Sequence, residues 1–181
     1  EEIEKLGGKS LPFKLDVRNE NDIQRCIDET YHKWKSIDVL INNAGALWWK
    51  SILDTPVSKY DLINNINSRA SFLLSKAAIP YMMKNNGGHI INCSPPLLNN
   101  DELFMLKGKT AYLISKLGMT LTSLGIAEEF RGKNISSNTL WPMTPVESYA
   151  LINNNLGDKK SWRKHDIISD SILHILKEDK N

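Results

Sequence analysis

Short apolar runs that alternate with amphipathic segments are the feature that most constrains the fold of this chain. Residues 37–41 (Ile-Asp-Val-Leu-Ile) and 89–93 (His-Ile-Ile-Asn-Cys) are β-branched runs of strand length, bounded by polar residues. Such runs are typical of buried parallel strands, and residues 11–17 and 135–140 are predicted to be strands as well. The connections are long enough for helical crossovers. The pattern therefore predicts a three-layer α/β fold, a doubly wound parallel sheet with helices on both faces.

Helices are predicted in the connecting segments. Apolar residues recur every three or four positions up to residue 34, which predicts a helix there. Asn19, a favoured N-cap residue, is expected to cap it. Further helices are expected over residues 58–84, 112–130 and 166–176. The segment 58–84 is apolar on more than one side, so the sheet and a second surface should both cover it.

Composition and charge exclude several classes of partner. Lys+Arg 23 against Asp+Glu 21 gives a net charge of +2, and the two signs are interleaved, so neither nucleic acid nor an anionic membrane is expected as a partner. No apolar stretch approaches the roughly 20 residues of a bilayer span, and the N-terminal sequence does not read as a signal peptide. Cys26 and Cys93 lack metal-ligand spacing. We therefore expect no metal site and a reducing intracellular compartment, cytoplasmic by default, with peroxisome and mitochondrion left open.

The pair Tyr112 and Lys116 is the strongest candidate for chemistry. Side chains four positions apart share one face of a helix, and a nearby ammonium lowers the pKa of a phenol by about 1–3 units. Such a phenol can exchange a proton with a substrate oxygen. The pair follows a strand and a long loop, which places it at the edge of an α/β sheet where ligands bind. Tyr31 and Lys35 have the same spacing but precede a strand, so we interpret them as structural.

Asparagine-rich motifs lie at the same edge. Asn42-Asn43-Ala44-Gly45 directly follows the strand 37–41, and its small residues would let a ligand approach the backbone while the amides link neighbouring strands. A plain turn is the alternative interpretation. Asn67 lies mid-helix among apolar neighbours, where asparagine is unfavourable, and a solvent-facing side chain is its alternative.

Taken in order, these motifs resemble the short-chain dehydrogenase/reductase family. The resemblance rests on residues 42–45, 65–67 and 112–116, and residues 92–96 and 140–144 resemble its hydroxysteroid dehydrogenase-like branch. It implies a Rossmann-like fold and an NAD(P)-dependent oxidoreductase, using NAD or NADP to interconvert a hydroxyl and a carbonyl on an apolar, lipid-like or steroid-like substrate. It also implies a homodimer or homotetramer packed through the two long helices.

The resemblance further implies roles for individual residues. Tyr112 would be the acid–base, Lys116 would tune it and hold the cofactor ribose, Asn67 would support a proton relay, and Ser94 is the candidate for orienting the substrate. Asp16 resembles the acidic residue that contacts adenine, with a helix-capping or loop aspartate as the alternative. The residues expected to contact the cofactor are Asp16, Val17, Asn42, Ala44, Gly45, Tyr112, Lys116, Pro142 and Thr144.

Two positions depart from the family pattern. Pro95 stands where the family places its substrate-orienting serine, which leaves Ser94 as the nearest hydroxyl. A non-catalytic or weakly active cofactor-binding or scaffolding domain on the same fold is therefore the alternative function. Met143 replaces a glycine that usually follows the proline, which restricts the backbone beside Thr144.

The remaining expectations concern the substrate side and the extent of the fold. Trp48 and Trp49 are expected to line an apolar substrate pocket or a subunit interface, and residues 145–164 to form a mobile substrate lid. The order of motifs predicts that residues 1–181 are a single domain that forms the later two-thirds of a larger one. A glycine-rich phosphate cradle is expected upstream, and the last strand of the sheet is expected to lie outside the chain.

Overall fold

The computed structural model describes residues 2–153 and 156–178. At its centre, three parallel strands are hydrogen-bonded in the order β1-β2-β3. They are β1 (Val39–Asn42), β2 (Gly88–Asn92) and β3 (Ile135–Thr139). Asn42 pairs with Asn92, and Asn92 pairs with Thr139, so the strands end level with one another. The predicted parallel sheet is confirmed for these three segments, and their carboxyl ends form one edge.

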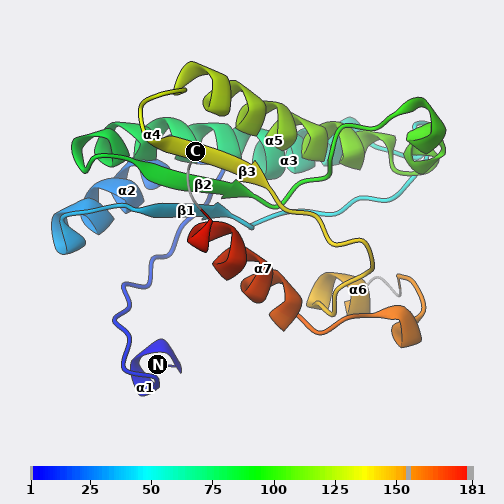
Figure 1. Ribbon diagram of the computed structural model, residues 1–181. Helices are drawn as coiled ribbons and strands as arrows, with labels where there is room; N and C mark the ends of the chain where they lie inside the picture. The colour runs from blue at the N-terminus through cyan, green and yellow to red at the C-terminus, as the bar shows by residue number, and fades with distance from the viewer. Residues whose placement is uncertain (1, 154–155, 179–181) are drawn as a thin grey trace.

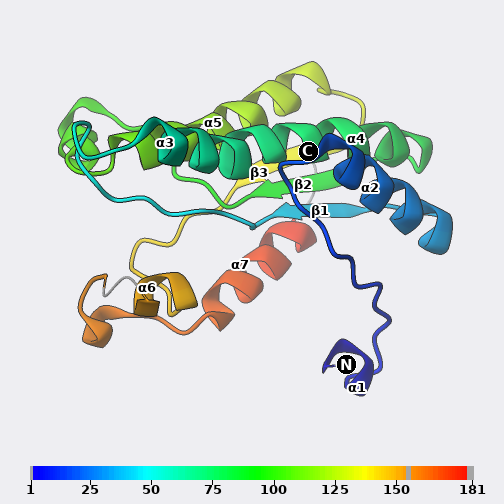
Figure 2. The ribbon, with the colours of Figure 1, turned by 180° about the vertical axis from the view of Figure 1, so that it is seen from behind.

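A layer of long helices covers one face of this sheet (Figures 1 and 2). These helices are α2 (Glu20–Trp34), α3 (Val57–Asn64), α4 (Ala70–Lys84) and α5 (Thr110–Glu129). Asn19 caps α2 as predicted, because its side-chain oxygen accepts hydrogen bonds from the N–H groups of Asn21 and Asp22. The predicted helix 58–84 consists of α3 and α4 joined by a π-helical turn, Asn65–Arg69.

The hydrophobic core lies between this helical layer and the sheet. Every residue of β2 is buried, and Ile90 packs in one cluster with Met82 of α4 and Ile126 of α5. Each such side chain contributes about 1.5–3 kcal/mol through burial of its apolar surface. Tyr31 also packs against this cluster, while Lys35 ends α2 in the left-handed conformation. The structural interpretation of that second Tyr–Lys pair is confirmed.

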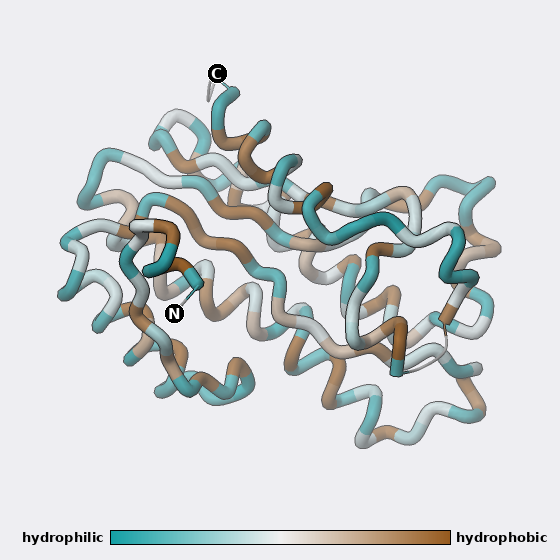
Figure 3. The backbone as a smooth tube through the Cα atoms, turned by 90° about the horizontal axis from the view of Figure 1, so that it is seen from below, coloured by the Kyte–Doolittle hydropathy of each residue, from teal (hydrophilic) through white to brown (hydrophobic). Residues whose placement is uncertain are grey.

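The other side of the sheet carries shorter elements (Figures 1 and 2). They are α1 (Glu2–Lys5), α6 (Tyr149–Asn153) and α7 (Asp166–Lys177). Hydrophobic and hydrophilic stretches alternate along α7 (Figure 3), which buries Ile172. Two 3₁₀ turns, Asn100–Leu106 and Lys159–Ser161, lie in the long loops. Helices therefore lie on both faces, as the alternating pattern predicts.

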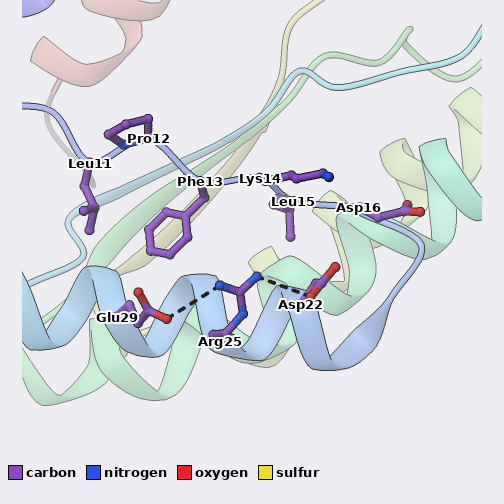
Figure 4. A pocket seen from close by; sticks show the side chains of 9 residues that line it. All are labelled: Leu11, Pro12, Phe13, Lys14, Leu15, Asp16, Asp22, Arg25 and Glu29. Atoms are coloured by element: carbon purple, nitrogen blue, oxygen red, sulfur yellow. Dashed lines mark hydrogen bonds and ion pairs between the residues drawn. The ribbon is translucent and has the colours of Figure 1, made fainter.

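The predicted strand at residues 11–17 is wrong. The segment is extended, and Phe13 and Leu15 are half-buried while Lys14 and Asp16 between them are exposed, but it pairs with none of the strands. It runs beside α2 and borders a groove of about 580 Å³ (Figure 4). Arg25 of α2 lies 6.0 Å from the Phe13 ring centroid. Alternating burial specifies an extended backbone, but a strand also needs a neighbour for its ladder hydrogen bonds.

The outward surfaces of α4 and α5 carry exposed apolar side chains, among them Phe72, Leu121 and Leu124. Within residues 2–153 and 156–178, no helix combines the length and hydropathy needed to cross a membrane. The same residues contain no cluster of three or more His, Cys, Asp and Glu side chains that could hold a metal ion.

Candidate active site

A cavity of about 620 Å³ opens at the carboxyl edge of the sheet. Segments that follow all three strands line it: Gly45 comes after β1, Cys93 after β2 and Trp141 after β3. The first turns of α5 add Tyr112 and Lys116. Parallel strands that end together create a crevice of this kind, and the crossover helices begin beside it.

Tyr112 and Lys116 are both buried, with 8% and 6% of their surfaces exposed. The Lys116 ammonium donates a hydrogen bond of 2.8 Å to the carbonyl oxygen of Cys93. Burial raises the pKa of Tyr112 to about 12 and lowers the pKa of Lys116. In this arrangement burial dominates, and the lowering of the pKa expected from Lys116 is not seen. Dehydration disfavours the phenolate, and the ammonium is directed at a carbonyl instead.

Asn67 is fully buried at the centre of the π-helical turn. Its Oδ1 accepts from the Ala46 N–H at 2.8 Å, and its Nδ2 donates to the Ala46 carbonyl at 3.0 Å and to Ser115 Oγ at 2.8 Å. Ser115 in turn donates to the Tyr112 carbonyl at 2.7 Å. The amide therefore fastens the loop after β1 to the first turns of α5, and a solvent-facing Asn67 is excluded.

Gly45 lies between two of the predicted site residues. A Cβ atom at this position would come within 3.2 Å of Asn67 Oδ1 and 3.4 Å of Lys116 Nζ. The first separation is tighter than most van der Waals contacts of a Cβ atom, and the second is at the short end of their ordinary range. A side chain here would therefore press against the Asn67 amide and leave little space beside the Lys116 ammonium.

Asn42 links the strands rather than facing the cavity around Tyr112. It is 4% exposed, and its Nδ2 donates to Asn92 Oδ1 at 2.8 Å across the β1–β2 pair. Asn92 Nδ2 donates onward to Ser123 Oγ of α5 at 2.6 Å. The expectation that an asparagine amide joins neighbouring strands is confirmed, and the chain of amides continues into the helical layer.

A second cavity, of about 300 Å³, contains the remaining small residues of the motif. Val17, Asn42 and Ala44 line it, and Asn43 lines both this cavity and the larger one. Asp16 lies outside both, on the groove beside α2 (Figure 4). Its carboxylate accepts hydrogen bonds from Nε and Nη2 of the Arg18 guanidinium and from the Arg18 backbone N–H, which hold the pKa of Asp16 at about 2.

Ser94 is fully buried, and its hydroxyl oxygen has no hydrogen-bond partner among the described residues. It is not among the residues that line the large cavity. Pro95 is fully buried beside it, and its carbonyl accepts a 2.6 Å hydrogen bond from Thr120 Oγ1 of α5. The structure therefore does not bring Ser94 together with Tyr112 in this cavity.

The segment after β3 forms a large part of the cavity wall. Pro142 and Thr144 line it, and so do apolar residues of the predicted lid such as Val146 and Leu151. Val146 pairs with Arg163 in a short bridge that ties the two ends of this segment together. Residues 154–155 of the predicted lid lie outside the described residues.

The two adjacent tryptophans pack into the same region. Both lie against a buried cluster that contains Tyr112, and Trp49 also lines the cavity, with its ring centroid 6.2 Å from that of Tyr112. The indole N–H groups of Trp48 and Trp49 are buried without a hydrogen-bond partner among the described residues. Their expected place beside a pocket is thus confirmed for Trp49.

Several polar contacts of the site escape sequence reasoning. Ser115, Thr120 and Ser123 of α5 hold Asn67, Pro95 and Asn92 in place, yet serine and threonine in a helix give no signal of their partners. All three are small polar residues buried on a mainly apolar helix, which is the one local indication that they have buried partners. Lys109 lines the cavity as well and has no such signal.

Comparison with known proteins places the chain in a family. The family model described as "Enoyl-(Acyl carrier protein) reductase" matches residues 1–167. Hydroxysteroid dehydrogenase-like protein 2 of Homo sapiens is 43% identical over 182 residues, which cover 100% of this chain and 43% of that protein. The protein of the same name from Danio rerio is 43% identical over 180 residues, covering 98% of this chain and 42% of the relative. The chain thus spans less than half the length of these relatives.

Solved structures agree with the sequence comparison. A short-chain dehydrogenase from Mycobacterium thermoresistibile has a TM-score of 0.87 and 37% identity, covering 98% of this chain and 63% of that one. A metagenomic short-chain oxidoreductase, crystallised in complex with NADP, has a TM-score of 0.72 and 24% identity, covering 90% of this chain and 75% of that one. The second likeness shows the fold alone. From its fold, its matched family model and these relatives, the chain belongs to the short-chain dehydrogenase/reductase family.

Proposed function

We propose that this chain carries the catalytic site of an NAD(P)-dependent oxidoreductase that interconverts a hydroxyl and a carbonyl group on an apolar substrate. The observation that carries the proposal is that Tyr112 and Lys116 line one largely apolar cavity of about 620 Å³ at the carboxyl edge of the sheet. Membership of the short-chain dehydrogenase/reductase family supports it.

Tyr112 is the group that exchanges the proton. Burial keeps the phenol protonated, with a pKa of about 12, so in the reducing direction it is poised to donate to the oxygen of a carbonyl as negative charge develops there. The phenolate that remains after proton donation is unfavourable, because the site is buried and solvates a negative charge poorly. The nearby charge of Lys116 offsets that cost once its ammonium turns from the Cys93 carbonyl toward the phenol.

The residues around the two cavities fit a dinucleotide cofactor. Gly45 leaves open the space that a Cβ would fill beside Lys116, and Pro142 and Thr144 line the same cavity. We infer that these residues hold the nicotinamide half, while Val17 and Ala44 in the second cavity, with Asp16 near them in sequence, hold the adenosine half. A bound nicotinamide would supply the hydride for reduction or accept it in oxidation.

Asn67 is inferred to be a positioning residue. Its amide fixes the Ala46 backbone and, through Ser115, the first turns of α5, so it sets where Tyr112 stands relative to the loop after β1. A proton relay from Lys116 past this buried amide is part of the proposal.

One observation favours the non-catalytic alternative. The buried Ser94 hydroxyl does not line the cavity, and Pro95 has no side-chain donor, so neither residue at the family's serine position presents a hydroxyl to the cavity. A protein that binds the cofactor without turnover would have this arrangement too. The retained Tyr112 and Lys116 favour the enzyme.

We also propose that the protein assembles as a homodimer or homotetramer through α4 and α5. Phe72 is 55% exposed and Leu121 is 59% exposed on these helices. Apolar side chains exposed on two neighbouring helices are a surface that a second copy can bury.

The test of the enzymatic role uses two matched variants of the full-length protein. The protein is titrated with NADH and NADPH and then assayed with a panel of ketones and acyl-CoA substrates. Tyr112→Phe is expected to lower turnover by about 100-fold or more, the contribution of a positioned acid, while it binds the cofactor normally. Tyr31→Phe, at the second Tyr–Lys pair, is expected to change neither. A Tyr112→Phe protein with the native rate would refute the role, and cofactor binding without any turnover by the wild type would support the alternative.

A further inference from the structure

One part of the cavity wall has no role in the proposed proton transfer. Lys109 is the N-cap residue of α5, three positions before Tyr112, and both line the cavity. Its ammonium lies 4.5 Å from the centroid of the Trp49 ring, and that ring in turn meets Tyr112 in an edge-on contact. An ammonium, an indole and a phenol thus stand in a continuous series along the wall.

The charge of this cavity has a single sign. Within the described part of the chain, the charged side chains that line it are Lys109 and Lys116, and no aspartate or glutamate does. Lys116 donates to the Cys93 carbonyl. Lys109 is half-buried, and its ammonium has no hydrogen bond and no ion pair with any described residue; its contact is the indole face of Trp49. A negatively charged ligand would supply the counter-ion that the Lys109 ammonium lacks among the described residues.

The rest of the wall is mainly apolar. Leu47 and Met105 lie on the loops near Trp49, and Leu151 and Ile168 come from the segment after β3. A purely apolar molecule would fill this space but would leave the Lys109 charge without a counter-ion. A molecule with an apolar body and an acidic end would pack its body against the apolar residues and pair its negative charge with Lys109.

We propose that the substrate of this cavity is an amphipathic acid, an apolar chain or ring system that carries a carboxylate, and that Lys109, seated on Trp49, binds its carboxylate. The inference rests on the proposed function, since it names the substrate class of that same site. Because an ammonium binds as a compact point charge, Lys109 selects for negative charge more than for a particular shape. Its place three residues before Tyr112 sets the acidic end and the reacting oxygen on one wall of the cavity.

The dinucleotide is a competing source of negative charge, because its phosphates are anionic. If Lys109 served the cofactor, its removal would weaken cofactor binding rather than the binding of acids. The experiment therefore measures the two ligands separately.

The test measures binding by calorimetry with the full-length protein, using two probes of equal chain length, the anionic octanoate and the uncharged octanol. Neither probe requires turnover, so the result stands apart from the proposed reaction. Wild type is expected to bind octanoate about tenfold or more tightly than octanol, as expected for a hydrogen bond to a charged group. Lys109→Met is expected to lose that preference, and Lys109→Arg to keep it. Lys107→Met, an exposed lysine outside the cavity, is the control for net charge and should behave as wild type.

Each outcome supports or refutes the assignment of Lys109 to a substrate carboxylate. Loss of the octanoate preference in Lys109→Met with unchanged NADPH affinity supports the inference, even if no ketone is ever turned over. Equal binding of octanoate by Lys109→Met and wild type refutes it. A Lys109→Met protein whose NADPH affinity falls as much as its octanoate affinity also refutes it and assigns the lysine to the cofactor phosphates. A wild type that fails to reduce ketones but prefers octanoate would remove the proposed reaction and leave the carboxylate site.

Discussion

Replacement of Asn67 by alanine should destabilise the fold far more than a typical asparagine-to-alanine change. The amide makes hydrogen bonds to the N–H and the carbonyl of Ala46 and to Ser115 Oγ, and it is fully buried. Removing it leaves both Ala46 backbone groups without their partner, at about 1–2 kcal/mol each for a half-buried site, and the lost bond to Ser115 adds about 1 kcal/mol. The expected loss is therefore about 3–5 kcal/mol of folding free energy.

The assay is urea denaturation of the full-length protein, followed by circular dichroism. Asn64→Ala is the matched control, because Asn64 lies one turn earlier and donates a single side-chain bond to the Tyr60 carbonyl. That change should cost at most about 1 kcal/mol, because the half-buried Asn64 loses a single exposed hydrogen bond. Cofactor affinity and turnover of Asn67→Ala should fall as well, because the loop at Gly45 and the start of α5 lose their common anchor.

The reasoning is refuted if Asn67→Ala and Asn64→Ala unfold at the same urea concentration. Equal midpoints would mean that water satisfies the freed Ala46 groups, and that the amide does not fix the loop. A lower midpoint with unchanged turnover would separate the two claims and would leave Asn67 a purely structural residue.

Two other predictions concern alkaline stability and assembly. Burial raises the pKa of Tyr112 to about 12, above its ordinary value, so its contribution to stability is complete below about pH 10 and is lost as the pH rises toward 12. Between pH 9 and pH 11, wild type should lose about 1 kcal/mol more than Tyr112→Phe, measured by urea denaturation. Equal losses in the two proteins would mean that the phenol is not buried. Leu121→Glu should shift the protein toward the monomer in sedimentation velocity, whereas Leu53→Glu, at a side chain 97% exposed and outside α4 and α5, should not; an unchanged sedimentation coefficient for Leu121→Glu would exclude this surface.

Local sequence signals predict the elements of this fold well. The cap at Asn19 and the β-branched runs at β1 and β2 act over a few residues, and the structure has these elements where the sequence indicates. The segment 11–17 shows the limit of such signals. Its alternation specifies an extended chain with one half-buried face, whereas pairing depends on which backbone lies next to it.

The candidate site likewise has features set by local sequence and features set by distant parts of the chain. The spacing of Tyr112 and Lys116 places both in one cavity, as predicted, because helical geometry is local. The direction of the Lys116 ammonium is set by the Cys93 carbonyl, which comes from a distant part of the chain, so its effect on the phenol is not readable from spacing. The predicted role of Ser94 in orienting the substrate is not supported for a similar reason, since its hydroxyl is buried beside Pro95 and does not line the cavity.

The chain of amides from Asn42 through Asn92 to Ser123 has a consequence for how this sequence can change over time. Each member satisfies the next across strand β2, so a substitution at one position strands a buried polar partner at another. Single changes at Asn42 or Asn92 should therefore be rare in natural relatives, and changes at the two positions should arrive together. Asn42 and Asn92 should therefore be kept or replaced as a pair, although 50 positions separate them in the sequence.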